Sequence, residues 1–320
     1  MDEVDRIKTR TSNWNVRRLS LQRSNALDIS YDPPQREWSV NNTFESVDAP
    51  TVRQKFRIRP IAILHDNRDV IWNSIVMLSS SEDKTLIEKQ FNLIASRRDK
   101  RFKVYPIELN SQPFLFIETG VGSGATNMVV EILSALEISP IVKVGTCSAL
   151  QKDLREGDVI LVRHALDDEG ASKYDYSYVP NINELKKSQP YDTLTNILYQ
   201  KLSQVSNPKY SIYEKSNRPT MLSVDSYESF DISTDFYLDI KDHDVLGVEM
   251  ECSALFSCCQ KYKIPCAALI TVSRSQEHLI SKFNHYDQRV KDDLAKKVTA
   301  IQCSLISDLT KILSGMVVKT

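Results

Sequence analysis

The stretch TGVGSGATNMVVEILSALEISPIVKVGTCSAL, residues 119–150, joins a glycine-rich turn, a run with helical periodicity and an apolar strand. Gly120, Gly122 and Gly124 follow one predicted strand and open a predicted helix over residues 125–138. Backbone amides at such a helix start, together with the helix dipole, can bind an anion. The turn has neither the G-x-G-x-x-G spacing of dinucleotide sites nor a Walker lysine. By itself it fits an anion cradle and a tight corner that binds nothing equally well.

On either side of this stretch, the chain alternates short apolar runs with longer amphipathic segments. The alternation predicts an α/β fold with a mixed, largely parallel central sheet and helices on both faces. Residues 1–55 show no sustained period, so we predict a flexible N-terminal arm there and one domain over residues 56–320. We predict strands over 60–66, 102–109, 113–120, 140–146, 157–166, 218–226 and 265–273, and helices over 83–98, 125–138, 193–205, 248–264 and about 287–314.

The composition argues against several functional classes. The 320 residues carry a net charge of −1, which argues against a strong electrostatic affinity for nucleic acid or for a membrane surface. No apolar run reaches about 18 residues and the start MDEVDRIKTR is charged, so we expect a cytoplasmic protein without a membrane span. The six cysteines form no C-x-x-C pair, which favours reduced core residues over a metal site.

A second motif lies at the end of the predicted strand 140–146. Lys143, Gly145 and Thr146 fall at its carboxyl end, which is where open α/β sheets bind their ligands. A lysine charge, a close backbone approach and a hydroxyl together suit a phosphate dianion. The motif therefore predicts a site for free phosphate.

A third motif is the sequence GVEMECSALF, in which Glu249 and Glu251 flank Met250. Two carboxylates among apolar residues are costly unless one of them has a partner, and sugar hydroxyls are natural donors to a carboxylate. Acidic side chains are also favoured at a helix N-terminus, with no ligand involved. The residues by themselves leave both interpretations open.

In this order and at these separations, the three motifs resemble the nucleoside phosphorylase superfamily. The resemblance covers about residues 58–315 and extends to VGTCSALQKDLREGDVILV, DDEGAS and ALITVSRSQE. Within the superfamily the chain is most similar to the uridine phosphorylases. The informative position is Arg274, because purine-directed members place an acidic residue after the sequence VS. The resemblance implies a three-layer αβα fold.

The resemblance also implies a reaction. Inorganic phosphate, the co-substrate, attacks C1′ of a pyrimidine nucleoside such as uridine and releases the base and ribose 1-phosphate, with no metal or other cofactor. Relatives form dimers that complete each other's sites, so a homodimer or higher oligomer is expected. By position in the motifs, Glu251 accepts the ribose hydroxyls and Met250 packs on the ribose, and Glu249 is expected to bind the substrate as well. Arg274 stabilises the leaving base, with Tyr227 beside it. Lys143 replaces a phosphate-binding arginine, and Gly122 and Thr146 meet phosphate or ribose.

The match departs from the family pattern in three places. A catalytic histidine that the neighbouring subunit supplies in many relatives has no counterpart ahead of the sequence RPIAIL. The family's first phosphate loop appears as LHDNRD, in which Asp66 matches an aspartate and Arg68 lies nearby but out of register. The base-binding segment appears as VDSYESFDIS, residues 224–233, without the glutamine and arginine that hold uracil. Three functions therefore stay open. We expect a uridine phosphorylase-like pentosyltransferase, and the alternative is an inactive member that serves as a nucleoside-binding or assembly partner. A nucleosidase that uses water in place of phosphate is disfavoured, because such enzymes usually carry an aspartate at the position of Arg274.

Overall fold

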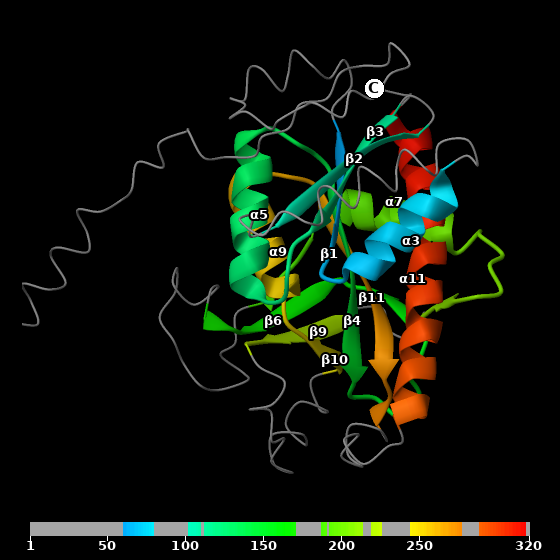
Figure 1. Ribbon diagram of the computed structural model, residues 1–320. Helices are drawn as coiled ribbons and strands as arrows, with labels where there is room; N and C mark the ends of the chain where they lie inside the picture. Colours follow the sequence, from blue (N-terminus) through cyan, green and yellow to red (C-terminus); the bar gives the residue numbers. More distant parts are fainter. Residues whose placement is uncertain are drawn as a thin grey trace, which may run out of the picture. The chain divides into compact units, whose positions relative to one another are not determined.

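The computed structural model describes residues 60–79, 102–109, 112–170, 187–190, 192–213, 219–225, 244–276 and 288–317 (Figure 1). The predicted arm over residues 1–55 and the predicted helix over 83–98 lie outside the described residues. Tyr227 and most of the altered base-binding segment lie outside them too. The boundary at residue 56 and the role of Tyr227 therefore stay predictions.

The described strands form one connected sheet. Of its ten strand pairs, six are parallel, so the sheet is mixed and largely parallel as predicted. Its main path runs β2-β3-β1-β4-β10-β9-β6-β7, and β11, β5 and β8 branch from β4. The strands are β1 Ile61–His65, β2 Lys103–Leu109, β3 Gln112–Glu118, β4 Ile141–Ala149, β5 Asp158–Leu161, β6 His164–Asp168, β7 Lys187–Ser188, β8 Ser211–Ile212, β9 Thr220–Val224, β10 Val245–Glu249 and β11 Cys266–Arg274.

Helices cover both faces of this sheet. One layer contains α5, which packs against α9, and the other contains α11, against which α3 and α7 pack (Figure 1). The predicted three-layer αβα arrangement is thus confirmed. Among the described helices, none has the length and apolar character needed to cross a bilayer. The helices are α3 Arg68–Leu78, α5 Ser123–Ala135, α7 Asp192–Leu202, α9 Cys252–Tyr262 and α11 Gln288–Val317.

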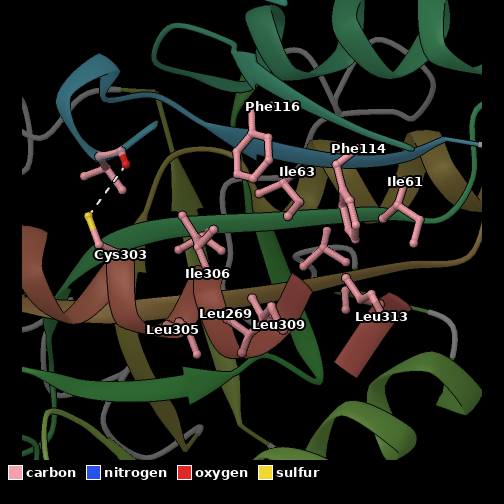
Figure 2. Packing of buried hydrophobic residues seen from close by; sticks show 14 of the residues in the cluster. Ile61, Ile63, Phe114, Phe116, Leu269, Cys303, Leu305, Ile306, Leu309 and Leu313 are labelled. Atoms are coloured by element: carbon pink, nitrogen blue, oxygen red, sulfur yellow. Dashed lines mark hydrogen bonds between the residues drawn. The ribbon is translucent and has the colours of Figure 1, made fainter. Parts of the chain in front are cut away.

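The layer that contains α11 covers a large apolar cluster. Alternate residues of β1 and β3 point toward α11, while the intervening residues of β1 are buried against the other layer, so β1 is apolar on both faces. Leu64 pairs with Lys143 of β4, and paired residues of neighbouring strands share a face. Lys143 therefore faces the layer of α5 and α9. The cluster beneath α11 includes Ile61, Ile63, Phe114, Phe116, Leu305, Ile306, Leu309 and Leu313 (Figure 2).

The edge arrangement of β4 creates an opening in the sheet. Along one edge, β4 pairs with β11 over almost its whole length. Along the other, β1 pairs in parallel with residues 141–143, and β10 pairs antiparallel with residues 148–149. Within the described residues, 144–147 thus have no strand partner on that edge. The opening therefore lies beside the middle of β4 and not at its carboxyl end as predicted, because β4 continues to Ala149. The carboxyl end that reaches the opening is that of β1. Diverging neighbours at the carboxyl end of a strand are the usual ligand site of α/β sheets.

Two predicted elements were wrong in their extent. The segment 157–166 was predicted as one strand but forms two, because β5 pairs antiparallel with β11 whereas β6 pairs in parallel with β9. The segment 248–264 was predicted as one helix, but Val248 and Glu249 complete β10, and the helix begins at Cys252. Both errors have the same cause, since strand pairing with distant segments overrode the local periodicity.

Helix α3 was not predicted. Its start carries a recognisable signal, because the Asn67 side chain accepts a hydrogen bond from the backbone N–H of Asp69 at 2.8 Å. An asparagine N-cap followed by the buried residues Val70, Ile71 and Ile75 is typical of an amphipathic helix. Only two residues, Asp66 and Asn67, separate β1 from the helix, so the loop between β1 and α3 is short.

Candidate active site

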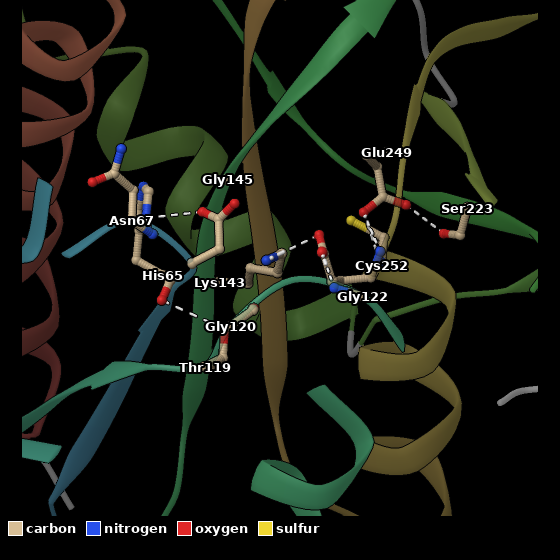
Figure 3. Close-up of polar contacts among 12 residues, drawn as sticks. His65, Asn67, Thr119, Gly120, Gly122, Lys143, Gly145, Ser223, Glu249 and Cys252 are labelled. Carbon is tan, nitrogen blue, oxygen red and sulfur yellow. Dashed lines mark hydrogen bonds and ion pairs between the residues drawn. The ribbon is translucent and has the colours of Figure 1, made fainter. Parts of the chain in front are cut away.

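Four elements bring polar groups to the opening beside β4. Glu251 caps α9, Gly122 caps α5, Lys143 lies on β4 and Asp66 follows β1. Figure 3 shows the hydrogen bonds and ion pairs around these groups. Four of the predicted site residues are therefore neighbours in space, although they come from four separate parts of the chain.

The glycine turn holds a backbone conformation that few other residues adopt. Gly122 has φ 97° and ψ 164°, in the region where a side chain causes strain. Its N–H lies at the start of α5, where the helix itself offers no acceptor. That N–H donates to Oε1 of Glu251 at 2.6 Å. The glycine-rich turn therefore does bind an anionic group through its backbone amide, and that group is the carboxylate of Glu251.

Glu251 also meets a buried cation. Its Oε2 lies 3.3 Å from Nζ of Lys143, and both side chains are almost fully buried. Burial alone lowers the pKa of Lys143, but the charges of Glu251 and Asp66 outweigh it and hold that pKa above its ordinary value. Lys143 is therefore a charged ammonium beside a carboxylate, in a place that water hardly reaches.

Gly145 makes room for the lysine side chain. A Cβ atom at this position would lie 3.2 Å from Cε of Lys143 and 3.2 Å from Cδ1 of Ile270. Residues two apart on a strand share a face, so the stem of Lys143 extends over Gly145 toward Glu251. The carbonyl oxygen of Gly145 accepts a hydrogen bond from Nε2 of Gln302 on α11 at 2.9 Å. The absence of a side chain at residue 145 is what allows the lysine to take this course.

Glu249 has a different environment from Glu251. Its Oε2 accepts the backbone N–H groups of Glu251 and Cys252, each at 2.8 Å, and its Oε1 accepts the hydroxyl of Ser223. Burial and the neighbouring charge of Glu251 raise the pKa of Glu249, and the hydrogen bonds offset this only partly. Both oxygens of Glu249 are thus engaged by donors from the protein.

The loop after β1 brings Asp66, but not Arg68, into the described cluster. Oδ1 of Asp66 lies 3.0 Å from Nδ1 of the buried His65, which also accepts the backbone N–H of Asn67 at 2.8 Å. Burial raises the pKa of Asp66, but His65 and Lys143 outweigh it, so the pKa lies well below its ordinary value. Arg68 is exposed at the first turn of α3, where its charge acts on Tyr105.

The remaining predicted residues lie at the same end of the sheet. Thr146 is half-buried on β4 and pairs with Thr271 of β11. Met250 is half-buried between the two glutamates, and Arg274 is exposed at the last position of β11. Their predicted roles toward ribose, phosphate and base stay predictions.

Two cysteines border the site without offering a nucleophile. Burial, reinforced by the charge of Glu249, raises the thiol pKa of both Cys147 and Cys252. A thiol held protonated is a poor nucleophile. All six cysteines are buried, and none forms a disulfide. Within the described ranges, no group of three or more His, Cys, Asp or Glu side chains is arranged to hold a metal ion.

Sequence reasoning missed the residues that support Glu249. Ser223 on β9 donates to Glu249 and accepts the backbone N–H of Ser253 at 3.0 Å. The hydroxyl of Ser253 donates in turn to Oε1 of Glu169 at 2.5 Å. No local pattern marks a serine within TMLSV as a partner of a glutamate on another strand, and only the pairing of β9 with β10 places the two together.

Comparison with known proteins agrees with the fold and the motifs. The chain matches the phosphorylase superfamily over residues 75–306 and belongs to that superfamily. The family predicted from the motifs is thus confirmed.

Two curated relatives are purine enzymes. A guanosine phosphorylase from Halorubrum lacusprofundi is 25% identical over 184 residues, which are 56% of this chain and 68% of the relative. A DeoD-type purine nucleoside phosphorylase from Bacillus cereus is 28% identical over 162 residues, 48% of this chain and 60% of the relative. The matched region thus spans only about three fifths to two thirds of these relatives. A pyrimidine preference of this chain therefore stays a prediction.

Solved structures of enzymes with different activities share the fold of this chain. Uridine phosphorylase from Vibrio fischeri matches with a TM-score of 0.57 at 20% identity and covers 83% of this chain and 95% of its own. A 5′-methylthioadenosine/S-adenosylhomocysteine nucleosidase from Campylobacter jejuni matches with a TM-score of 0.58 at 13% identity, covering 80% and 98%. At such identities the likeness shows the fold alone.

Proposed function

We propose that the protein cleaves the N-glycosidic bond of a pyrimidine nucleoside by transferring the pentose to inorganic phosphate. A phosphate oxygen forms a bond to C1′ as the bond between C1′ and the base breaks. The bonding electron pair leaves with the base, which then takes up a proton. The products are the free base and ribose 1-phosphate, and no metal or further cofactor takes part.

The single observation that carries this proposal is the placement of Glu251. Its carboxylate is held by the amide of Gly122 and the ammonium of Lys143 at the opening of the sheet. Each carboxylate oxygen has two acceptor positions, so both can also accept a hydroxyl of the ribose. A sugar held in one orientation beside the phosphate gains the rate advantage of proximity.

Lys143 and Arg274 supply the charges for the other two partners. Lys143 is a buried ammonium suited to the phosphate dianion, although it lacks the planar fork of arginine. Arg274, at the carboxyl end of β11, is the proposed stabiliser of negative charge on the leaving base. Its replacement of an acidic residue supports a pyrimidine, and among pyrimidine nucleosides we propose a uridine-like substrate.

The test is formation of the pentose 1-phosphate with and without inorganic phosphate: ribose 1-phosphate from uridine, inosine and guanosine, and 2-deoxyribose 1-phosphate from thymidine and deoxyuridine. Phosphate-dependent release of uracil supports the whole proposal. Phosphate-dependent release of a purine base alone would support phosphorolysis but contradict the proposed preference for pyrimidine nucleosides. Free ribose formed without phosphate would instead show that water is the nucleophile. If a folded sample forms no product from any of these nucleosides, the proposal is wrong.

A second candidate function is nucleoside binding without turnover, as an assembly partner. The observation that favours it is that the Lys143 ammonium already lies between the charges of Glu251 and Asp66, which weakens its attraction for a dianion. Binding of uridine in titration calorimetry, together with the absence of any product, would support this second function over catalysis. In either case we propose a homodimer or higher oligomer, which sedimentation of the purified chain tests.

A further inference from the structure

The start of α9 is capped in an unusual way. An N-cap side chain ordinarily accepts backbone N–H groups of the first turn, but Glu251, the N-cap of α9, makes no such bond. Glu249 instead accepts the N–H groups of Glu251 and Cys252, and Ser223 accepts the N–H of Ser253. Two residues from neighbouring strands thus do the capping, and they leave the side chain of Glu251 available for the site.

The same two residues are joined to one another. The Ser223 hydroxyl donates to Oε1 of Glu249, and both side chains are fully buried. A further bond from Ser253 to Glu169 ties the first turn of α9 to the end of β6. The backbone of residues 251–253 is therefore fixed to three strands, β6, β9 and β10.

A fixed backbone at Glu251 sets the position of its carboxylate. The two contacts of that carboxylate, with Gly122 at 2.6 Å and with Lys143 at 3.3 Å, lie on elements that α9 does not share. A shift of the α9 start by an ångström would lengthen both contacts and move the acceptor oxygens relative to a bound sugar. Misplacements of that size can cost about 100-fold in rate.

We propose that Ser223 and Glu249 are positioning residues that act through Glu251 on recognition of the ribose hydroxyls. This inference rests on the proposed function, because the hydroxyls are those of its substrate. It gives Glu249 a role other than direct contact with the nucleoside. It also adds Ser223, which is fully buried and forms its hydrogen bonds with Glu249 and Ser253.

The experiment compares Ser223→Ala, Glu249→Ala, Glu249→Gln and Glu251→Gln with the wild type. Ser314→Ala is the matched control, because Ser314 is also buried but bonds within α11, at the carbonyl of Thr310. Each variant is assayed with a ribonucleoside and with its 2′,3′-dideoxy analogue, which lacks both hydroxyls. Thermal unfolding of every variant reports any general loss of stability.

Ser223→Ala and Glu249→Ala are expected to lower kcat/KM for the ribonucleoside at least about tenfold and to affect the dideoxy analogue much less. Glu249→Gln keeps an oxygen that can accept both amides, so its kcat/KM is expected to stay within about threefold of wild type. In the Glu251→Gln background, Ser223→Ala should have no further effect, because the residue through which it acts is gone.

Equal losses for both substrates, or full additivity in the double variant, would overturn the positioning role. A Glu249→Gln variant as impaired as Glu249→Ala would show that Glu249 contacts the substrate itself. If the wild type turns over no nucleoside, the proposed function fails, and crystal structures of the variants decide the positioning role alone. The contact between Gly122 and Glu251, 2.6 Å here, should then be kept in Glu249→Gln and lost in Glu249→Ala. Its survival in Glu249→Ala and Ser223→Ala would refute the inference.

Discussion

Nζ of Lys143 lies 3.3 Å from Oε2 of Glu251, with both side chains almost fully buried. The lysine comes from the middle of β4 and the glutamate from the start of α9, and the glycine turn before α5 contributes a third group, the N–H of Gly122. A buried ion pair must compensate for the loss of hydration of both charges, and here the extra hydrogen bond contributes to that compensation.

Replacing Lys143 tests this pair and the proposed phosphate site. Lys143→Met leaves Glu251 buried without its counter-charge, so we expect a loss of about 3–5 kcal/mol in the free energy of unfolding. Lys143→Arg keeps the charge and adds a planar fork that can bind carboxylate and phosphate together. It should therefore lower the KM for phosphate without changing the KM for the nucleoside. An unchanged phosphate KM in Lys143→Arg would show that residue 143 does not contact phosphate.

Gly145→Ala tests the path of the lysine side chain. The added Cβ would lie 3.2 Å from Cε of Lys143 and from Ile270, so we expect the lysine to shift, with a stability loss of about 1–3 kcal/mol. Activity should fall more than stability does. Gly124→Ala is the control, because Gly124 is exposed within α5 with nothing near its Cβ position, and alanine there should gain about 0.5–1 kcal/mol. Equal effects of the two changes on activity would contradict this explanation.

The raised pKa of Glu249 predicts a pH dependence of stability. Because the folded pKa lies above the ordinary 4.5, the folded state binds the proton more tightly than the unfolded state does. The stabilising contribution is present below 4.5 and is lost as the pH rises through the folded pKa. Glu249→Gln has no proton to lose, so its stability relative to wild type should increase over that range. Urea unfolding of both proteins from acid to neutral pH measures the difference, and parallel curves would refute the raised pKa.

Asp66 predicts a dependence of the opposite sign. Its folded pKa lies below the ordinary 3.8, so the contribution of its carboxylate is present above 3.8 and is lost as the pH falls through the folded pKa. Wild type should be more stable than Asp66→Asn at neutral pH, and this advantage should shrink only in strong acid. Unfolding of both proteins below pH 4 tests the sign. An advantage that disappeared already near neutral pH would be attributable to another group.

Arg274 is predicted to act on the leaving base. Arg274→Gln should lower kcat for uridine by about 100-fold while changing the KM little, because the charge it stabilises develops mainly in the transition state. A riboside with a better leaving group, such as p-nitrophenolate, needs less stabilisation and should be affected less. An equal loss for both substrates would remove Arg274 from leaving-group stabilisation.

Most of the described elements could be predicted from local pattern. The strands at 61–65, 103–109, 112–118 and 266–274 and the helices at 123–135 and 192–202 lie within a few residues of their predicted bounds. Runs of this kind carry their own periodicity, which does not depend on distant partners. The segments 157–166 and 248–264 were wrong because each changes its strand partner or its structure at a point that only pairing defines.

The sequence by itself determined the family, the glycine turn and the residue types of the candidate site. These features are encoded by local spacing and by side-chain chemistry, which survive in a linear chain. Only the tertiary structure decided which of these groups meet. Gly122 and Glu251 are 129 residues apart and share a hydrogen bond, and Ser223 reaches Glu249 only because β9 and β10 are paired. Two glutamates on either side of Met250 thus acquire different roles, because backbone donors enclose Glu249, whereas Glu251 faces the opening in the sheet.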